Sequence, residues 1–179
     1  MAAPESPLQV KLFMAHLFVG DDVVVEAKEI LQDEFGDIDY ISPAFPFLQE
    51  DYYAPEMGRP IFRKFFSFRK LINPQDIAAV KLRTNEIEQE LACHGRRRIN
   101  IDAGYMDFGK VVLASMKYQN QKIYLSGGVY ADMNLLYAKG KFKAMDWTFP
   151  DFKSASYSHV LLHIRAKYKA ALRKSRKGN

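Results

Sequence analysis

Three polar residues alternate with two isoleucines near the middle of the chain, as side chains do on the two faces of a β-strand. Ile99 and Ile101 would then face a core. The opposite face would carry Arg98, Asn100 and Asp102. Asp102 could act as a general base or bind a metal, and Asn100 could orient a ligand through paired hydrogen bonds. The structural alternative is that Asp102 caps a Gly-Tyr turn that ends the strand.

A long polar loop, residues 50–59, concentrates carboxylates and tyrosines. Long loops on a compact domain are often functional. Tyr52, Tyr53 and Glu56 are therefore candidates for ligand contact, with Glu56 as a second acid-base or metal-binding carboxylate. The alternative is a surface loop whose aromatic side chains cover the sheet.

A predicted helix has a polar side of its own. Lys81, Thr84, Asn85 and Glu88 follow one another at i, i+3, i+4 and i+7, and this spacing puts them on one side of the helix. A solvated edge with a Lys-Glu pair explains the pattern equally well, so it does not define a site by itself.

The only tryptophan stands shortly before a Pro-Asp pair. Trp147 could stack on a base or a sugar. We favour the structural interpretation, in which Trp147 and Phe149 close the end of the core and Asp151 starts a helix.

Other patterns favour ordinary structural roles. His159 and His163 have a two-ligand spacing for zinc but lack the Glu of the metalloprotease motif, so we expect no metal site there. Residues 62–70 interleave aromatic and basic side chains, which is typical of a core strand with Arg and Lys reaching solvent. The chain has no phosphate-binding P-loop, no dinucleotide-binding glycine motif and no nucleophile elbow. The sequence identifies no cofactor.

The elements that must position these residues form a recognisable order. A buried strand is predicted over residues 9–19, followed by a helix to residue 35 that Asp21 or Asp22 caps. Residues 38–47 and 61–71 are extended. Asn73-Pro74 starts a second helix, and a strand over residues 97–102 completes a βαββαβ order. This is the ferredoxin-like plan of an α+β protein.

The second half of the sequence predicts an antiparallel β-meander. A hairpin turns at residues 119–121, and Gly pairs or Lys-Gly turns separate the later strands, which extend to residue 145. A C-terminal amphipathic helix begins near Ser154. It buries one stripe of large side chains: Tyr157, Leu161, Ile164, Tyr168 and Leu172. We expect residues 1–179 to form a single domain with flexible tails at about 1–8 and 174–179.

Composition bounds the class of protein. A hydrophobic fraction of 48% with 26% charged residues is typical of a soluble globular domain. The single cysteine fits a reducing compartment, and neither a secretion signal nor an apolar run of about 20 residues is visible, so the prediction is a cytoplasmic protein with no membrane segment. Eight basic residues and no acidic one follow Asp151. This basic C-terminal helix is the basis of an alternative function in RNA or nucleoprotein binding.

Several of these stretches together resemble a known family. Residues 100–105 resemble the N-I-D-P-G-Y motif of an uncharacterised bacterial and archaeal family of about this length, a domain of unknown function. The resemblance covers nearly the whole chain and includes residues 52–58, 81–88, 122–132 and 147–152. The chain departs from the motif at Ala103, where proline is usual. Some members of such families are labelled as GTP-binding, although these residues contain no P-loop.

The resemblance suggests that the flagged stretches converge on one pocket. Our leading hypothesis is a polar pocket for a small ligand, a nucleotide or another phosphate-bearing metabolite, with Asp102 and Glu56 as its catalytic carboxylates. The proposed ligand-binding residues are Arg98, Asn100, Tyr105, Tyr52, Tyr53, Lys81, Asn85, Glu88, Trp147 and Asp151. The sequence leaves open whether a reaction takes place, and a protein-interaction subunit is a third alternative.

Overall fold

Nine strands form one antiparallel sheet within residues 1–177, the part of the chain that this computed structural model describes. The strand order is β2-β4-β1-β5-β6-β8-β7, with β3 beside β4 and β9 beside β8. The strands are β1 (Val10–Phe18), β2 (Ile38–Ile41), β3 (Phe45–Pro46), β4 (Phe62–Ile72), β5 (Ile99–Met106), β6 (Lys110–Ser115), β7 (Ile123–Ser126), β8 (Val129–Ala138) and β9 (Lys141–Ala144).

Five α-helices accompany the sheet in the described residues, which confirms a mixed α+β fold with a C-terminal helix. They are α1 (Asp21–Phe35), α2 (Ala54–Met57), α3 (Ile77–Glu90), α4 (Pro150–Lys153) and α5 (Ser158–Lys177). Two short 3-10 helices, η1 (Glu50–Tyr52) and η2 (Pro74–Asp76), precede α2 and α3. No helix within residues 1–177 is both long and apolar enough to cross a bilayer.

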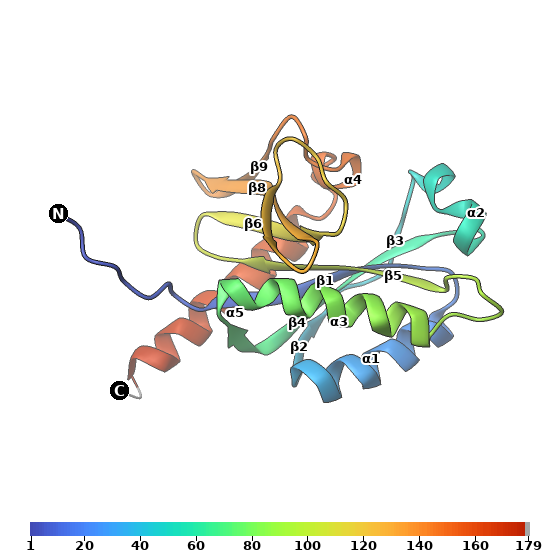
Figure 1. Ribbon diagram of the computed structural model, residues 1–179, viewed down its shortest axis with the longest axis horizontal. Coiled ribbons are helices and arrows are strands. Elements are labelled where there is room, and N and C mark those ends of the chain that lie inside the picture. The colour runs from blue at the N-terminus through green and yellow to red at the C-terminus, as the bar shows by residue number, and fades with distance from the viewer. Residues whose placement is uncertain (178–179) are drawn as a thin grey trace.

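The sheet is covered on both faces. In Figure 1, α1 and α3 lie below β1 and β5, whereas α2 and the strands β6, β8 and β9 rise above them. Alternate residues of β1 supply the two faces: Met14 belongs to the core under α1 and α3, and Phe13 belongs to the core under α4 and α5. The predicted stripe of α5 is confirmed, because Tyr157, Leu161, Ile164, Tyr168 and Leu172 are all buried.

Local signals explain where the second long helix begins. Asn73 and Asp76 form a reciprocal capping box around Pro74 at the start of η2, which leads directly into α3. The first helix begins differently from our expectation. Its N-cap is Gly20, with no side-chain cap hydrogen bond, and the two aspartates lie in the first turn, where they face the positive end of the helix.

The predicted Gly-Tyr turn is wrong, because Gly104 and Tyr105 lie inside β5, which continues to Met106. Gly104 is needed for close packing between strands. A Cβ at this position would lie 2.6 Å from the carbonyl oxygen of Val112 and 2.7 Å from the Leu113 side chain. Glycine is therefore required here because β6 lies close to the end of β5, and not because the chain turns.

The predicted hairpin at residues 119–121 is also wrong. β6 and β7 do not pair with each other, because β8 lies between them and pairs with both. After β6, the hairpins that form are β7–β8, turning at Gly127-Gly128, and β8–β9, turning at Lys139-Gly140. The last helix also starts later than expected: α4 occupies residues 150–153, and α5 begins at Ser158.

Candidate functional site

The candidate site is a cavity of about 570 Å³ at the point where β6 separates from β5. These strands pair only between residues 104–106 and 111–113, so no described strand pairs with residues 99–103 of β5 on that side. Side chains from α3, from the η1–α2 segment and from α4 complete the lining. The split in the sheet is thus the origin of the cavity.

Two charged side chains of α3 occupy the open edge of β5. Lys81 donates a hydrogen bond of 2.8 Å to the carbonyl of Ile101, and the amide of Ile101 donates one of 2.7 Å to Glu88. Lys81 and Glu88 are 3.7 Å apart and are both buried. The alternative of a solvated helix edge is therefore wrong. The two side chains satisfy backbone groups that a neighbouring strand would otherwise satisfy.

A single arginine of β4 reaches across β1 to two carboxylates. Arg63 donates to Asp102 at 2.7 Å and to Asp151 at 2.8 Å, and its side chain is only 4% exposed. On β1, Leu17 lies opposite Arg63 and Ala15 lies opposite Asp102, and the guanidinium also donates to the Ala15 carbonyl at 3.3 Å. Our interpretation of Arg63 as a cation reaching solvent is wrong.

The two carboxylates beside Arg63 differ in their tendency to hold a proton. Burial acts to raise the pKa of Asp102, but the nearby charges of Arg63 and Lys81 outweigh it. The net result, aided by a hydrogen bond of 3.0 Å from Asn100, is a lowered pKa. Burial raises the pKa of Asp151 despite the same arginine. Asp102 is therefore the carboxylate that stays ionised most readily.

Arg97 connects the η1–α2 segment to this network. Its guanidinium lies 3.3 Å from Glu56 and 3.4 Å from Glu88, and it donates to the Asn100 side chain at 3.3 Å. Burial raises the pKa of Glu88, and the charges of Lys81 and Arg97 act against that rise. Contacts of 3.4 Å or less thus run from Glu56 through Arg97 and Asn100 to Asp102.

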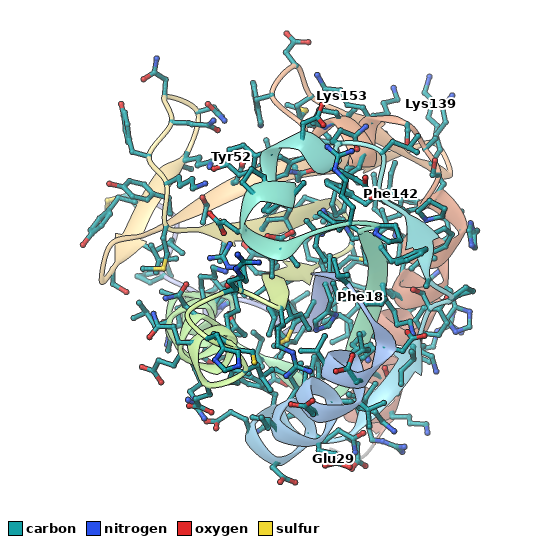
Figure 2. All side chains as sticks on the ribbon, turned by 90° about the vertical axis from the view of Figure 1, so that its right-hand side faces the viewer. Phe18, Glu29, Tyr52, Lys139, Phe142 and Lys153 are labelled. Carbon is teal, nitrogen blue, oxygen red and sulfur yellow. The ribbon has the colours of Figure 1, made fainter. Side chains whose placement is uncertain are left out.

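The opposite side of the cavity carries a second polar cluster. Lys122 donates to the Ser115 hydroxyl at 2.9 Å and to the Lys117 carbonyl at 3.2 Å, and it lies 3.7 Å from Asp132. The Lys117 ammonium donates to the Tyr52 hydroxyl, so this contact spans the cavity between the end of β6 and the η1–α2 segment. Figure 2 shows Tyr52 on the side of that segment that faces the β7 strand. Burial raises the pKa of Asp132.

These clusters define two walls of the cavity. We call the first the β5 wall; it consists of Arg63, Lys81, Glu88, Arg97, Asn100, Asp102 and Asp151. We call the second the β8 wall; it consists of Ser115, Lys117, Lys122 and Asp132.

Nine of the twelve residues proposed from the sequence line this one cavity. They are Asp102, Glu56, Asn100, Tyr52, Tyr53, Lys81, Asn85, Glu88 and Asp151. The structure thus brings these nine side chains together at one cavity.

Three of the proposed residues lie elsewhere. Arg98 pairs with Asp22 and Glu26 of α1, because it precedes β5 and does not follow the strand's alternation. Tyr105 lies beside a different cavity, near the N-terminal segment. Trp147 donates from its indole nitrogen to the carbonyl of Met133 and is 38% exposed.

Sequence reasoning missed five charged residues that line the cavity: Arg63, Arg97, Lys117, Lys122 and Asp132. A signal existed for Arg63. A cation whose side chain is buried beside aromatic residues of a central strand must be paired. Lys122 and Asp132 stand in stretches that carry the family resemblance, although their pairing depends on β8 lying beside both β6 and β7.

The lining as a whole is balanced in formal charge, with five basic and five acidic side chains. Such a surface can bind a polar molecule through several directional contacts, and it does not attract ions of one sign indiscriminately. Among the described residues no group of three or more His, Cys, Asp or Glu is arranged to hold a metal ion. His159 and His163 instead pack against the rings of Phe45 and Tyr40.

Comparison with known proteins gives one match. No curated protein and no solved structure matches the chain. The match is to a family described as a domain of unknown function, DUF4416, and it extends over residues 8–168, which include both walls of the cavity. The chain therefore belongs to the DUF4416 family.

Proposed function

We propose that the protein binds a small polar ligand, a nucleotide or another phosphate-bearing metabolite, in the cavity between β5 and β6. One observation carries this proposal: buried polar and charged side chains from β4, β5, β8, α3 and α4 converge on a cavity of about 570 Å³. Ligand pockets typically have about 300–1,000 Å³ and a few convergent polar groups. Burying ionic groups costs solvation free energy, so a cluster kept beside an open cavity favours a binding role over a packing role.

Asp102 and Glu56 are the two carboxylates to which we assign direct contact with the ligand. A general base at neutral pH works best with a pKa near the working pH, and the pKa of Asp102 is lowered. In our proposal Asp102 therefore acts as a fixed negative charge that accepts hydrogen bonds. Asp151, whose pKa burial raises, is the better candidate for holding a proton.

The experiment is thermal unfolding of the full chain with a panel of nucleotides, phosphorylated metabolites and divalent metals. A ligand present at about 100 times its dissociation constant adds ~2.7 kcal/mol of stability, a readily visible shift. We expect a selective rise in Tm that Asp102→Asn abolishes. The matched control is Asp33→Asn, which changes an exposed aspartate of α1 and should keep the rise.

Two outcomes would count against the proposal. Unchanged unfolding curves across the whole panel would remove the small-ligand function. A rise in Tm that Asp102→Asn retains in full would keep the function but remove Asp102 from the ligand contacts.

We also propose that residues 10–106 form a ferredoxin-like unit within a single domain. The order β2-β4-β1-β5, antiparallel throughout and with α1 and α3 on one face, supports this assignment.

A cytoplasmic location is supported by the single free and exposed cysteine, Cys93, which is typical of a reducing compartment. The GTP-binding label of the resemblance stays a prediction and contributes nothing to the proposal.

We do not adopt the rival function, RNA binding by α5. Arg165 is engaged within the protein, because its guanidinium lies 3.6 Å from the Tyr137 ring centroid and donates to the Phe108 carbonyl. A basic helix end is usually solvated and serves solubility. Removal of residues 173–179 tests this choice: RNA affinity that collapses on the deletion would restore the rival.

A further inference from the structure

The β8 wall contains the one cation of the cavity lining that has no carboxylate partner among the described residues. Arg63, Lys81, Arg97 and Lys122 each have a carboxylate within 4 Å. The ammonium of Lys117 contacts only the hydroxyl of Tyr52 and lies 4.7 Å from the centroid of its ring. An ammonium has three N–H donors, so Lys117 keeps donors available for an anion. Because Lys117 lines the cavity, these N–H donors can reach a ligand there.

The same wall contains a buried acceptor without a donor. Asp132 is 1% exposed and lines the cavity, and its Oδ1 has no hydrogen-bond partner among the described residues. Its other oxygen lies 3.7 Å from Lys122, which is beyond a hydrogen bond. A buried carboxylate oxygen without a donor is costly to the fold. A donor group on a ligand would satisfy it.

The charge already beside Asp132 indicates which kind of donor fits. Lys122 supplies one positive charge to this carboxylate, so a cationic ligand group would be repelled by Lys122 as well as attracted by Asp132. A neutral hydroxyl donates a hydrogen bond without that repulsion. The Asp132 position is therefore suited to a hydroxyl group.

Lys122 also fixes the anion site and the hydroxyl site relative to each other. Its ammonium donates to the Lys117 carbonyl and to Ser115 at the end of β6, while it pairs with Asp132 of β8. We propose that this wall binds a hydroxylated sugar phosphate, with the phosphate at Lys117 and a sugar hydroxyl donating to Oδ1 of Asp132. The inference rests on the proposed function and specifies its ligand class. A free sugar phosphate and the ribose phosphate of a nucleotide share this chemistry.

The experiment is calorimetric titration of the full chain with inorganic phosphate, ribose, ribose 5-phosphate, its 2-deoxy and 3-deoxy analogues, and adenosine monophosphate. We expect ribose 5-phosphate to bind about tenfold more tightly than phosphate, and at least one deoxy analogue to lose that gain, since a hydrogen bond to a charged group contributes at least that much. Adenosine monophosphate that binds more tightly than ribose 5-phosphate identifies a nucleotide as the source. The reverse order identifies a free sugar phosphate.

Two variants assign the contacts. Lys117→Gln should weaken phosphate and ribose 5-phosphate in parallel, and Asp132→Asn should reduce ribose 5-phosphate to the affinity of phosphate. The deoxy analogues test the same hydroxyl in the unaltered protein, so the inference does not depend on Asp132→Asn folding. Lys153→Gln, an exposed lysine of α4, serves as the control for Lys117 and should change neither affinity.

The outcomes separate the two proposals. Phosphate and all sugar phosphates binding with equal affinity would overturn this inference. Absence of binding by every one of these probes, combined with a Tm rise from another metabolite, would overturn it and leave the proposed function standing. Absence of binding here and in the whole thermal panel would overturn both.

Discussion

The two walls of the cavity contain buried charges that are paired to different extents. On the β5 wall, Arg63 lies within 2.8 Å of both Asp102 and Asp151, and Lys81 and Glu88 also hold the edge of β5. On the β8 wall, within the part of the chain that the structure describes, Lys117 lacks a carboxylate partner and Asp132 keeps one oxygen without a donor. We infer that the first wall mainly maintains the split in the sheet. The second is the one that a ligand would complete.

The largest effect is expected from removing the shared cation of the β5 wall. Arg63→Met removes the shared partner of the buried Asp151 and of Asp102, whose side chain is 25% exposed, and breaking a buried pair costs about 3–5 kcal/mol of unfolding free energy. Urea denaturation measures the loss. Arg69→Met is the matched control, since Arg69 is on the same strand with its side chain 73% exposed, and it should cost less than about 0.5 kcal/mol. Equal losses in the two variants would contradict a structural role for Arg63.

The pH dependence of stability probes the core on the face of the sheet opposite the cavity. Burial lowers the pKa of His16, which packs on Phe66, to about 4, whereas the unfolded chain takes up the proton near pH 6.5. Stability should therefore be complete above pH 6.5 and fall toward pH 4, by roughly 3 kcal/mol at ~1.4 kcal/mol per pKa unit. His16→Gln should flatten this part of the curve. The same slope in the variant would assign the effect to other groups.

Asp102 on the β5 wall and Asp132 on the β8 wall are expected to contribute differently to stability. The pKa of Asp102 is lowered, so its ionised form stabilises the fold above the pKa of the unfolded chain and that contribution is lost as pH falls. The pKa of Asp132 is raised by burial, so its ionised form opposes folding. At neutral pH, Asp102→Asn should cost about 2 kcal/mol, and Asp132→Asn should change stability by less than about 1 kcal/mol. If Asp132→Asn lost more unfolding free energy than Asp102→Asn, the β8 wall and not the β5 wall would be the one that mainly stabilises the fold.

The smallest effect on stability is expected at the mouth of the cavity. Glu56 pairs with Arg97 at 3.3 Å, but its side chain is 58% exposed, so Glu56→Gln should cost no more than about 0.5 kcal/mol. The ligand-induced rise in Tm should nevertheless shrink, because we assign Glu56 to the ligand contacts. A full rise in this variant would limit its role to the surface ion pair.

Local sequence signals were sufficient for most individual elements. The helix start at Asn73-Pro74, the alternation in β5 and the apolar stripe of α5 each depend on near neighbours in sequence, and all three were predicted. The pairing of β6 with β8 was not, because the sequence does not say which strand lies beside which when a loop is long enough to permit either. The role of Gly104 was missed for the same reason, since the close contact comes from Val112 on another strand.

The residues of the candidate site also fall into two groups, those that local patterns predict and those that depend on strand pairing. Asn100 and Asp102 were found from the alternation of side chains along a strand, and Glu88 was added because its helix carries the family resemblance. The β8 wall was missed because Lys122 and Asp132 meet only through the arrangement of three strands. Arg98 was assigned in place of its neighbour Arg97, because the prediction extended the strand's alternation to residue 98, which lies before the start of β5.

The most direct test of the ligand cavity is a map of backbone amide shifts by NMR on addition of ribose 5-phosphate. Our account expects the largest changes at Ser115, Lys117, Lys122 and Asp132, further changes at Asp102 and Glu56, and little change along α5. Changes confined to α5, or to the second cavity beside Tyr105, would contradict the assignment of the ligand to the split between β5 and β6.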